Sequence, residues 1–206
     1  MNTLYKMVLA TILLFMASLT YAQSNVEDLI AKRAQQKVKQ MTNYVEYMAN
    51  KDESLEDRKE YRTLALNLFI GHSDPYTLND TTRKGVYMQI TSKYRKKPTE
   101  RLMKDYFTGL INMRYNKVVI ESTDVKDIKV SELRKVGENE FECTCTFVQA
   151  FCGYRDGRPV YKDITKKRVT CHIFGEETVK VMANGEIKTS YEYIVLLGDV
   201  EALETN

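Results

Sequence analysis

Apolar residues in the first quarter of the chain recur three and four positions apart, with charged residues between them. This period is typical of an amphipathic helix, and it predicts one from about Asn25 to Asn50. Ser24 or Asn25 can cap its first turn, because a short side-chain oxygen accepts a hydrogen bond from a free amide. The predicted buried stripe is Val26, Ile30, Ala34, Val38, Met41, Val45 and Met48.

Two more helices are predicted in the same half. Ser54 followed by Asp57 resembles a capping box and predicts a second helix that stops near Gly71. Alternation across Val86–Ile90 predicts a short strand, and Pro98 and Thr99 then start a third helix that runs to about Arg114. The second helix buries Tyr61, Leu64, Ala65, Leu68 and Phe69, and the third buries Met103, Tyr106, Phe107, Leu110 and Ile111.

From Lys117 onward the period changes to the alternation of half-buried strands. Asp156-Gly157 and Asn184-Gly185 are hairpin turns, because both residue types tolerate positive φ. The sequence therefore predicts an antiparallel meander of four or five strands, and one α+β domain in which N-terminal helices pack on a curved sheet. The predicted inward residues are Phe141, Cys143, Cys145, Phe147 and Phe151, then Ile187, Tyr191, Tyr193, Val195 and Leu197.

The N-terminus resembles a secretory signal peptide. Lys6 precedes an apolar stretch from Met7 to Leu19, and Ala22 offers a small residue for cleavage before Gln23. The stretch is shorter than the roughly 20 apolar residues of a membrane-spanning helix. We therefore expect residues 1–22 to be a signal and residues 23–206 to form the domain, exported to the periplasm or secreted, with no transmembrane segment after signal removal. The alternatives are a retained anchor helix and a buried N-terminal helix.

The charge balance narrows the choice of partners. The chain has 31 basic and 28 acidic residues, a net charge of +3, which gives no electrostatic argument for nucleic-acid binding. One local cluster, Lys93–Lys97, could hold phosphate or an acidic glycan, although a solvated loop is the simpler interpretation.

The four cysteines allow a disulfide hypothesis. A three-residue loop at Asp156–Arg158 would place Cys143 directly across from Cys171, with the apolar residues of both strands on one face. An oxidising compartment would then permit a Cys143–Cys171 disulfide. The alternative is that all four cysteines are small buried hydrophobes or pair otherwise. Their spacing fits no zinc site, and no metal or cofactor is expected.

No catalytic motif is present, so catalytic residues cannot be assigned from the sequence. His172 adjoins Cys171, but neighbouring strand residues point to opposite faces and cannot form a thiol–imidazole couple. His72 is expected in a loop. Residues that could face a pocket are Tyr87, Tyr106, Glu121 and Asp124.

The predicted hairpin around Asp156 is the best candidate contact surface. Arginine and tyrosine are favoured at interface hot spots, although a hairpin tip also needs polar residues for solubility. The candidate binding residues are Tyr154, Arg155, Arg158 and Tyr161.

The order of elements from Val26 to Leu197 resembles the nuclear-transport-factor-two-like superfamily: helices, a short strand, an amphipathic helix ending at Met113–Asn116, then a long meander. The resemblance implies a sheet curved over helices around a pocket. Some members are isomerases or dehydratases with an acid–base pair, others bind partners, and many dimerise. The cystatin-like plan is the nearest competitor, but it usually has one main helix.

Two classes of function follow. The absence of a catalytic motif favours a non-enzymatic binding or assembly module of the cell envelope, with a protein partner or as a homodimer. The alternative is a small-molecule-binding protein or an isomerase- or dehydratase-like enzyme that uses the pocket. A filled space between helices and sheet would favour the first, and an open one with a buried carboxylate or histidine beside a tyrosine would favour the second.

Overall fold

The structure, a computed structural model, describes the backbone of residues 3–78, 80–95, 97–122, 124–182 and 186–205. Side chains are described within these ranges from residue 26 onward, except those of residues 73, 122 and 180–181. The helical elements are α1 (Thr3–Ala49), α2 (Leu55–Leu66), α3 (Met103–Ile111) and the 3₁₀ turns η1 (Ile70–Ser73) and η2 (Val125–Asp127). The strands are β1 (Tyr76–Leu78), β2 (Thr81–Arg83), β3 (Tyr87–Ile90), β4 (Thr99–Leu102), β5 (Lys117–Ser122), β6 (Lys129–Val130), β7 (Arg134–Lys135), β8 (Glu140–Arg155), β9 (Arg158–Val181) and β10 (Ile187–Thr205).

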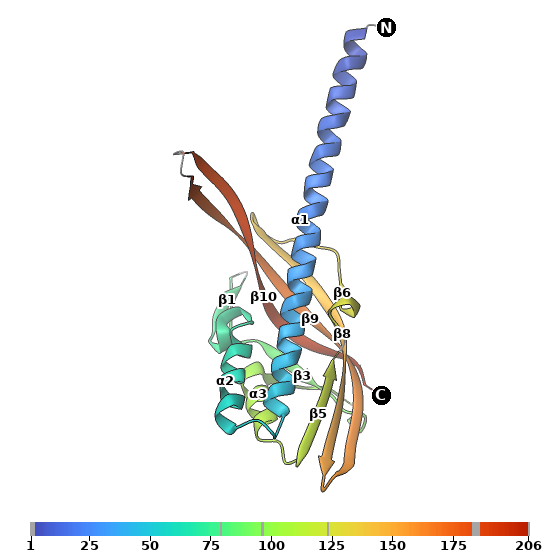
Figure 1. Cartoon of the computed structure of the whole chain (residues 1–206), viewed down its shortest axis with the longest axis vertical. Coiled ribbons are helices and arrows are strands. Elements are labelled where there is room, and N and C mark those ends of the chain that lie inside the picture. Colours follow the sequence, from blue (N-terminus) through green and yellow to red (C-terminus); the bar gives the residue numbers. More distant parts are fainter. Residues whose placement is uncertain (1–2, 79, 96, 123, 183–185, 206) are drawn as a thin grey trace.

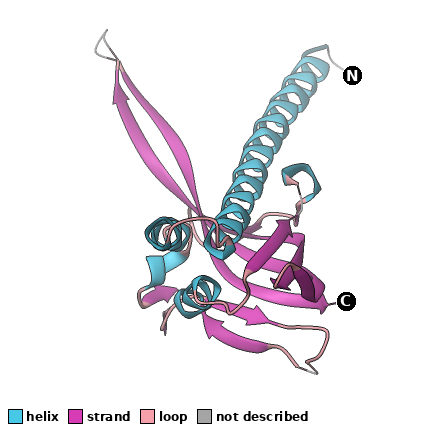
Figure 2. Ribbon diagram, turned by 60° about the horizontal axis from the view of Figure 1, so that its bottom comes forward, coloured by secondary structure: helices cyan, strands magenta, loops and turns pink. Residues whose placement is uncertain are grey.

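The chain has an α+β fold built on one large twisted sheet (Figure 1). The strand order is β4-β3-β10-β9-β8-β5, and β6 and β7 pair with β8 farther along its length. All neighbours are antiparallel except β3 and β10, which are parallel. The helices lie on one side of this sheet, and the distal part of the β9–β10 hairpin extends beyond it (Figures 1 and 2). The predicted fold class is therefore confirmed.

Helix α1 ends where the sequence predicts but begins much earlier, at Thr3. Ser24 and Asn25 thus lie inside a continuous helix and do not cap it, because nothing in the preceding residues interrupts helical hydrogen bonding. The predicted stripe is buried except for Val26, which is 37% exposed. The side chains of the expected signal, residues 1–22, lie outside those that are described. Within the described residues, no helix has the length and apolar character needed to cross a membrane.

The second helix is capped as predicted. The Ser54 hydroxyl accepts a hydrogen bond from the Asp57 amide at 3.1 Å and donates one to the Asp57 carboxylate at 2.7 Å. The stripe differs from the prediction at Leu64, which is 39% exposed, whereas Leu66 is buried. The helix ends at Leu66, earlier than the predicted stop near Gly71, and the buried Leu68 and Phe69 lie after its end. Gly71 lies within η1 with φ 74°, a conformation that favours glycine.

The predicted start of the third helix is wrong. Thr99–Leu102 forms strand β4, which pairs with β3 from Tyr87–Leu102 to Ile90–Thr99. This pairing supplies hydrogen-bond partners to the outer edge of β3, and the helix begins only at Met103. Tertiary pairing therefore overrides the local helix-start signal of Pro98.

The β8–β9 turn has two residues, Asp156 and Gly157, and not the predicted three. Both have positive φ, 49° and 75°, as a tight hairpin turn requires. A β-bulge at Val160 then adds one residue to β9, so that Gly153 opposes Tyr161. The bulge restores the register that the three-residue loop would have given, and Cys143 does oppose Cys171.

The thiols in this register are free. The Sγ atoms of Cys171 and Cys145 lie 3.7 Å apart, well beyond the roughly 2.05 Å of a disulfide bond. Contacts with the Cys143 and Cys145 thiols, together with burial, raise the pKa of Cys171 well above its usual value. The structure does not show the predicted Cys143–Cys171 disulfide, and these cysteines pack as small core residues.

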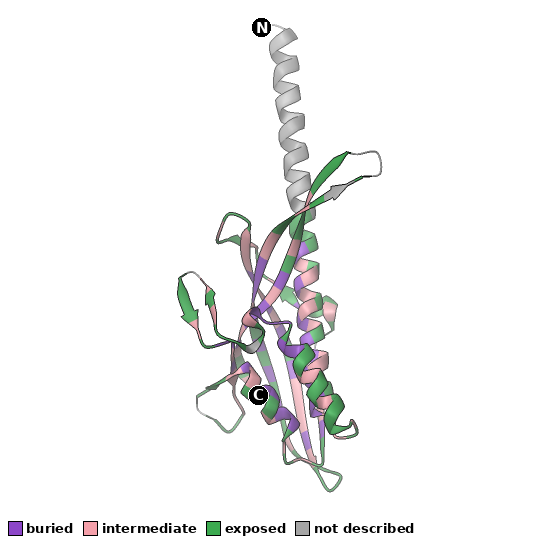
Figure 3. Cartoon of the chain, turned by 90° about the vertical axis from the view of Figure 1, so that its left-hand side faces the viewer, coloured by how far each residue is buried: buried purple, intermediate pink, exposed green. Residues whose placement is uncertain are grey.

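The inward face predicted for the last strand is only half correct. Val195 and Leu197 are buried, but Ile187 and Tyr191 are 66% and 54% exposed. These two lie on the distal part of the β9–β10 hairpin, which is largely coloured as exposed in Figure 3 and extends away from the helices in Figure 2. The predicted Asn184-Gly185 turn lies outside the described residues.

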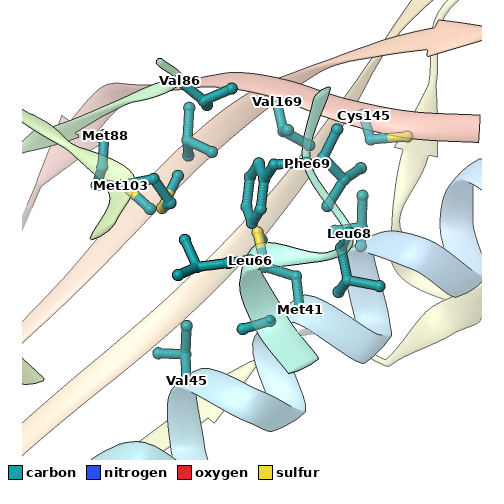
Figure 4. Close-up of a cluster of buried hydrophobic side chains, with 14 of the residues drawn as sticks. Met41, Val45, Leu66, Leu68, Phe69, Val86, Met88, Met103, Cys145 and Val169 are labelled. Atoms are coloured by element: carbon teal, nitrogen blue, oxygen red, sulfur yellow. The ribbon is translucent and has the colours of Figure 1, made fainter. Parts of the chain in front are cut away.

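The core fills one part of the space between helices and sheet. Figure 4 shows side chains from the three helices, the segment after α2, and strands β3, β8 and β9 converging around Phe69. The Phe69 and Phe107 rings are 6.0 Å apart between centroids, and both side chains are fully buried. The labelled members of the cluster are Met41, Val45, Leu66, Leu68, Phe69, Val86, Met88, Met103, Cys145 and Val169.

Candidate functional site

A cavity of about 350 Å³ opens where the core stops, between α3 and the sheet. Its apolar wall includes Ile90, Leu110, Met113, Ile120 and Phe151. Its polar wall comprises Gln89, Thr91, Ser92, Arg95, Tyr106, Tyr115, Gln149, Tyr161, Asp163, Thr165 and Lys167.

The polar wall arises from a change along two paired strands. On β9 the helix-facing residues Cys171 and Val169 are fully buried and apolar. The next residues on the same face are Lys167, Thr165 and Asp163, which are buried but polar. Strand β8 changes in parallel, because Gln149 follows Phe147 on that face and opposes Thr165. One continuous sheet face therefore serves as core wall and then as cavity wall.

Lys167 is the most unusual residue of the cavity, because lysine is rarely this buried. Its side chain is 9% exposed, and its amine donates a hydrogen bond to Gln149 Oε1 at 2.7 Å. The amine lies 5.8 Å from the centroid of the Tyr106 ring. Burial lowers the pKa of Lys167 to about 8, although the nearby Asp163 carboxylate acts in the opposite direction.

Asp163 is a buried carboxylate in contact with a tyrosine. The Tyr161 hydroxyl donates a hydrogen bond to Asp163 Oδ2. Burial, followed by this hydrogen bond, raises the pKa of Tyr161 to about 12. Burial also raises the pKa of Tyr106, and the Asp163 charge adds to the effect. Together, Tyr106, Tyr161 and Asp163 can hold an anionic or carbonyl oxygen of a ligand and can exchange protons with it.

Two residues of the basic cluster predicted at Lys93–Lys97, Lys93 and Arg95, lie beside the cavity. The Lys93 amine is 5.2 Å from the Tyr94 ring centroid and 5.9 Å from that of Tyr161. Arg95 lines the cavity and donates a hydrogen bond to Thr99 at 2.8 Å. Two positively charged side chains therefore lie beside the cavity.

The four candidate binding residues of the hairpin are separated by the structure. Tyr154, Arg155 and Arg158 lie at the β8–β9 tip, at the lower end of the molecule in Figure 1. Tyr161 lies beyond the bulge and lines the cavity, where the centroid of its ring is 5.7 Å from that of the Phe151 ring. Tyr161 therefore belongs to a different site from the other three.

Of the residues expected to face a pocket, Tyr106 does so. Glu121 and Asp124 are exposed. Tyr87 is not among the residues that line the cavity, and its backbone amide donates a hydrogen bond to Asp199 Oδ1 at 2.8 Å. The sequence analysis missed Gln149, Asp163 and Lys167. The sequence did contain a signal for Gln149, because Gln149 alternates in step with the inward-facing Phe147 and Phe151 and so lies on the same strand face.

His172 lies on the opposite sheet face from Cys171. Its Nδ1 is 3.4 Å from Glu142, and burial lowers its pKa although Glu142 opposes the shift. Among the residues whose side chains are described, no cluster of three histidine, cysteine or acidic side chains is arranged to hold a metal.

Comparisons with known proteins add little to this geometry. No protein-family profile matches the chain, and no curated protein matches its sequence. Among solved structures, the chain is similar to a provisionally named scytalone dehydratase from Novosphingobium aromaticivorans DSM 12444. The identity is 11% and the TM-score 0.39, over 88% of this chain and 90% of that one. The function is therefore argued from the site itself.

Proposed function

We propose that this protein binds a small organic molecule in the cavity beside Lys167. The volume of about 350 Å³ falls within the usual range for small-molecule sites. Such sites combine apolar walls with a few convergent polar groups, as this one does. The single observation that carries the proposal is the open cavity with two charged groups, Asp163 and Lys167, buried in its wall.

The charges favour a ligand with an acidic or carbonyl group. Lys93 and Arg95 lie beside the cavity and Lys167 lines it, whereas Asp163 supplies the one carboxylate among the described residues that line it. Isolated buried charges are costly, so a protein that retains them gains from a ligand that pairs with them. The aromatic rings of Tyr106, Tyr115 and Phe151 suit an apolar or aromatic body.

Acid–base catalysis is the second candidate. Asp163 can accept a proton from a bound molecule, and Tyr161 or Tyr106 can support a developing oxyanion. The order of elements resembles the nuclear-transport-factor-two-like plan, some members of which are isomerases or dehydratases. We place this role after binding, because proton transfer requires a bound substrate.

Binding can be tested with the anionic fluorophore anilinonaphthalene sulfonate and with aromatic carboxylates as competitors. We expect the fluorophore to bind and aromatic carboxylates to displace it better than the matching amides. Ser92→Trp should fill the cavity and abolish binding, whereas Thr82→Trp, at an exposed site on β2, should leave binding unchanged. Equal binding by both variants, with melting temperatures like the parent's, would exclude this cavity as the site.

Export and a protein contact at the hairpin tip remain proposals beside this one. The apolar stretch from Met7 to Leu19 supports export, and the Tyr154 and Arg158 side chains support a tip contact. Mass spectrometry of protein recovered outside the cytoplasm should show Gln23 as the first residue. A first residue upstream of Gln23 would contradict cleavage.

A further inference from the structure

We propose that Lys167 forms a reversible imine with an aldehyde or ketone group of the cavity's ligand. This rests on the proposed binding function and names the chemical class of the ligand. It also explains why the cavity holds an amine: pairing with an acidic ligand would need only a positive charge, whereas an imine requires an amine.

The position of the amine carries the inference. Lys167 lines the cavity, and its amine is held at 2.7 Å on Gln149, a neutral acceptor that does not stabilise the ammonium as a carboxylate would. The nearby carboxylate, Asp163, accepts the Tyr161 hydroxyl. The amine is therefore oriented by an amide while a proton acceptor remains close to it.

The surroundings favour the neutral, nucleophilic form of the amine. With a pKa of about 8, a tenth or so of Lys167 is neutral at pH 7, against well under a thousandth of an exposed lysine. Desolvated lysines in apolar pockets are the ones that form imines with carbonyl substrates. The Tyr106 ring on one side of the amine maintains this environment.

The reaction balances with the groups present. The neutral amine attacks the carbonyl carbon, the C–N bond forms, and the carbonyl electron pair moves to oxygen. Asp163 takes one proton from the nitrogen and passes it to that oxygen, which gives a neutral carbinolamine. Asp163 then takes the second nitrogen proton and delivers it to the hydroxyl, which leaves as water while the nitrogen electron pair forms the C=N bond. Amine and carbonyl thus give imine and water without an oxidant or reductant.

The mouth of the cavity selects within this class. Arg95 and Lys93 can pair with an acidic group at the far end of the ligand while its carbonyl reaches Lys167. An aromatic aldehyde that also carries a carboxylate, such as para-carboxybenzaldehyde, offers a group to each of these residues. We expect it to react better than benzaldehyde, which lacks the acidic group.

The test is reductive trapping on the full chain with para-carboxybenzaldehyde and sodium cyanoborohydride, read by peptide mass spectrometry. At about pH 8 we expect Lys167 to be labelled roughly tenfold faster than Lys166, because part of the pKa advantage is offset by lower intrinsic nucleophilicity. Lys166 is the matched control, since it neighbours Lys167 on β9 but is exposed. Labelling spread evenly over the lysines would overturn the inference.

Two variants complete the design. Lys167→Arg keeps the charge but cannot form an imine, so it should lose the fast labelling, whereas Lys166→Arg should keep it. Binding of anilinonaphthalene sulfonate to Lys167→Arg reports whether the cavity survives. Retained fluorophore binding by the parent without preferential labelling would reject the imine and leave the binding function standing. Absence of fluorophore binding by the parent would reject both.

Discussion

The same two layers form a dry core in one part of the molecule and an open cavity in the next. Around Phe69 the space between helices and sheet is filled by aliphatic, aromatic and sulfur-containing side chains (Figure 4). Beyond Val169 the space remains open, although Leu110 and Ile120 still contribute apolar walls. The strands are continuous through both regions, so the backbone alone does not explain the difference.

The side chains explain it. Replacing apolar residues by Gln149, Thr165 and Lys167 on the inner face leaves polar groups that need partners. The Lys167 amine donates a hydrogen bond to Gln149 on β8, and the Thr165 hydroxyl shares one with Thr205 on β10. The comparison teaches that one part of the inner face supplies stability, while the other holds a lysine at a cost in stability. Such a cost is typical of functional sites.

The largest expected effect is in the dry region. Phe69→Ala should lower the free energy of unfolding by about 3–5 kcal/mol, because it leaves a void in a close-packed cluster. Phe151→Ala, on the cavity wall, should have a smaller effect, since one side of that ring already faces open space. Urea unfolding measures both, and equal losses would contradict the division into two regions.

An effect of opposite sign is expected at Lys167. Lys167→Met should raise the free energy of unfolding by about 1–3 kcal/mol at pH 7, because it removes the cost of burying a charge. Lys166→Met should change it by less than about 0.5 kcal/mol, because that side chain is exposed. Thermal or urea unfolding of both variants measures these changes. A destabilised Lys167→Met would show that the lysine is needed for packing.

A smaller effect is expected from His172, which lies in neither region. Its folded pKa is lowered by burial, so the unfolded chain binds more protons as the pH falls. Stability should therefore be fully present above the unfolded pKa of about 6.5 and decline as the pH drops through the folded value. His172→Gln should flatten this part of the profile, which unfolding curves between pH 5 and 8 would measure. A profile identical to the parent's would assign the slope to other groups.

The smallest effect is expected at the hairpin tip. Tyr154→Ala and Arg158→Ala should each change the free energy of unfolding by less than about 0.5 kcal/mol and should leave fluorophore binding in the cavity unchanged. Tyr161→Phe, a few residues away, should alter cavity binding by removing the hydrogen bond to Asp163. If the tip variants weaken cavity binding as well, the two sites are coupled.

Much of the architecture follows from local patterns. The stripe of α1, the Ser54 cap and the alternation along β8 predict their elements because each depends on residues close in sequence. The opposition of Cys143 and Cys171 was also predictable, since only one register places both apolar faces inward. This opposition was predicted correctly although the predicted loop length was wrong, because burial of the apolar face, and not the turn, decides the register.

The sequence by itself determined the α+β class, the order of the three helices and the long strands, the β8–β9 register and the absence of an electrostatic case for nucleic acid. Tertiary structure alone decided that Thr99–Leu102 is a strand, that the cysteines are free and that the polar inward positions of β8 and β9 converge on a cavity. The reason is physical: alternation states which face a residue occupies, but only the way the helices pack on the sheet decides whether that face meets side chains or open space. Lys167 and Asp163 gain their chemistry from that boundary.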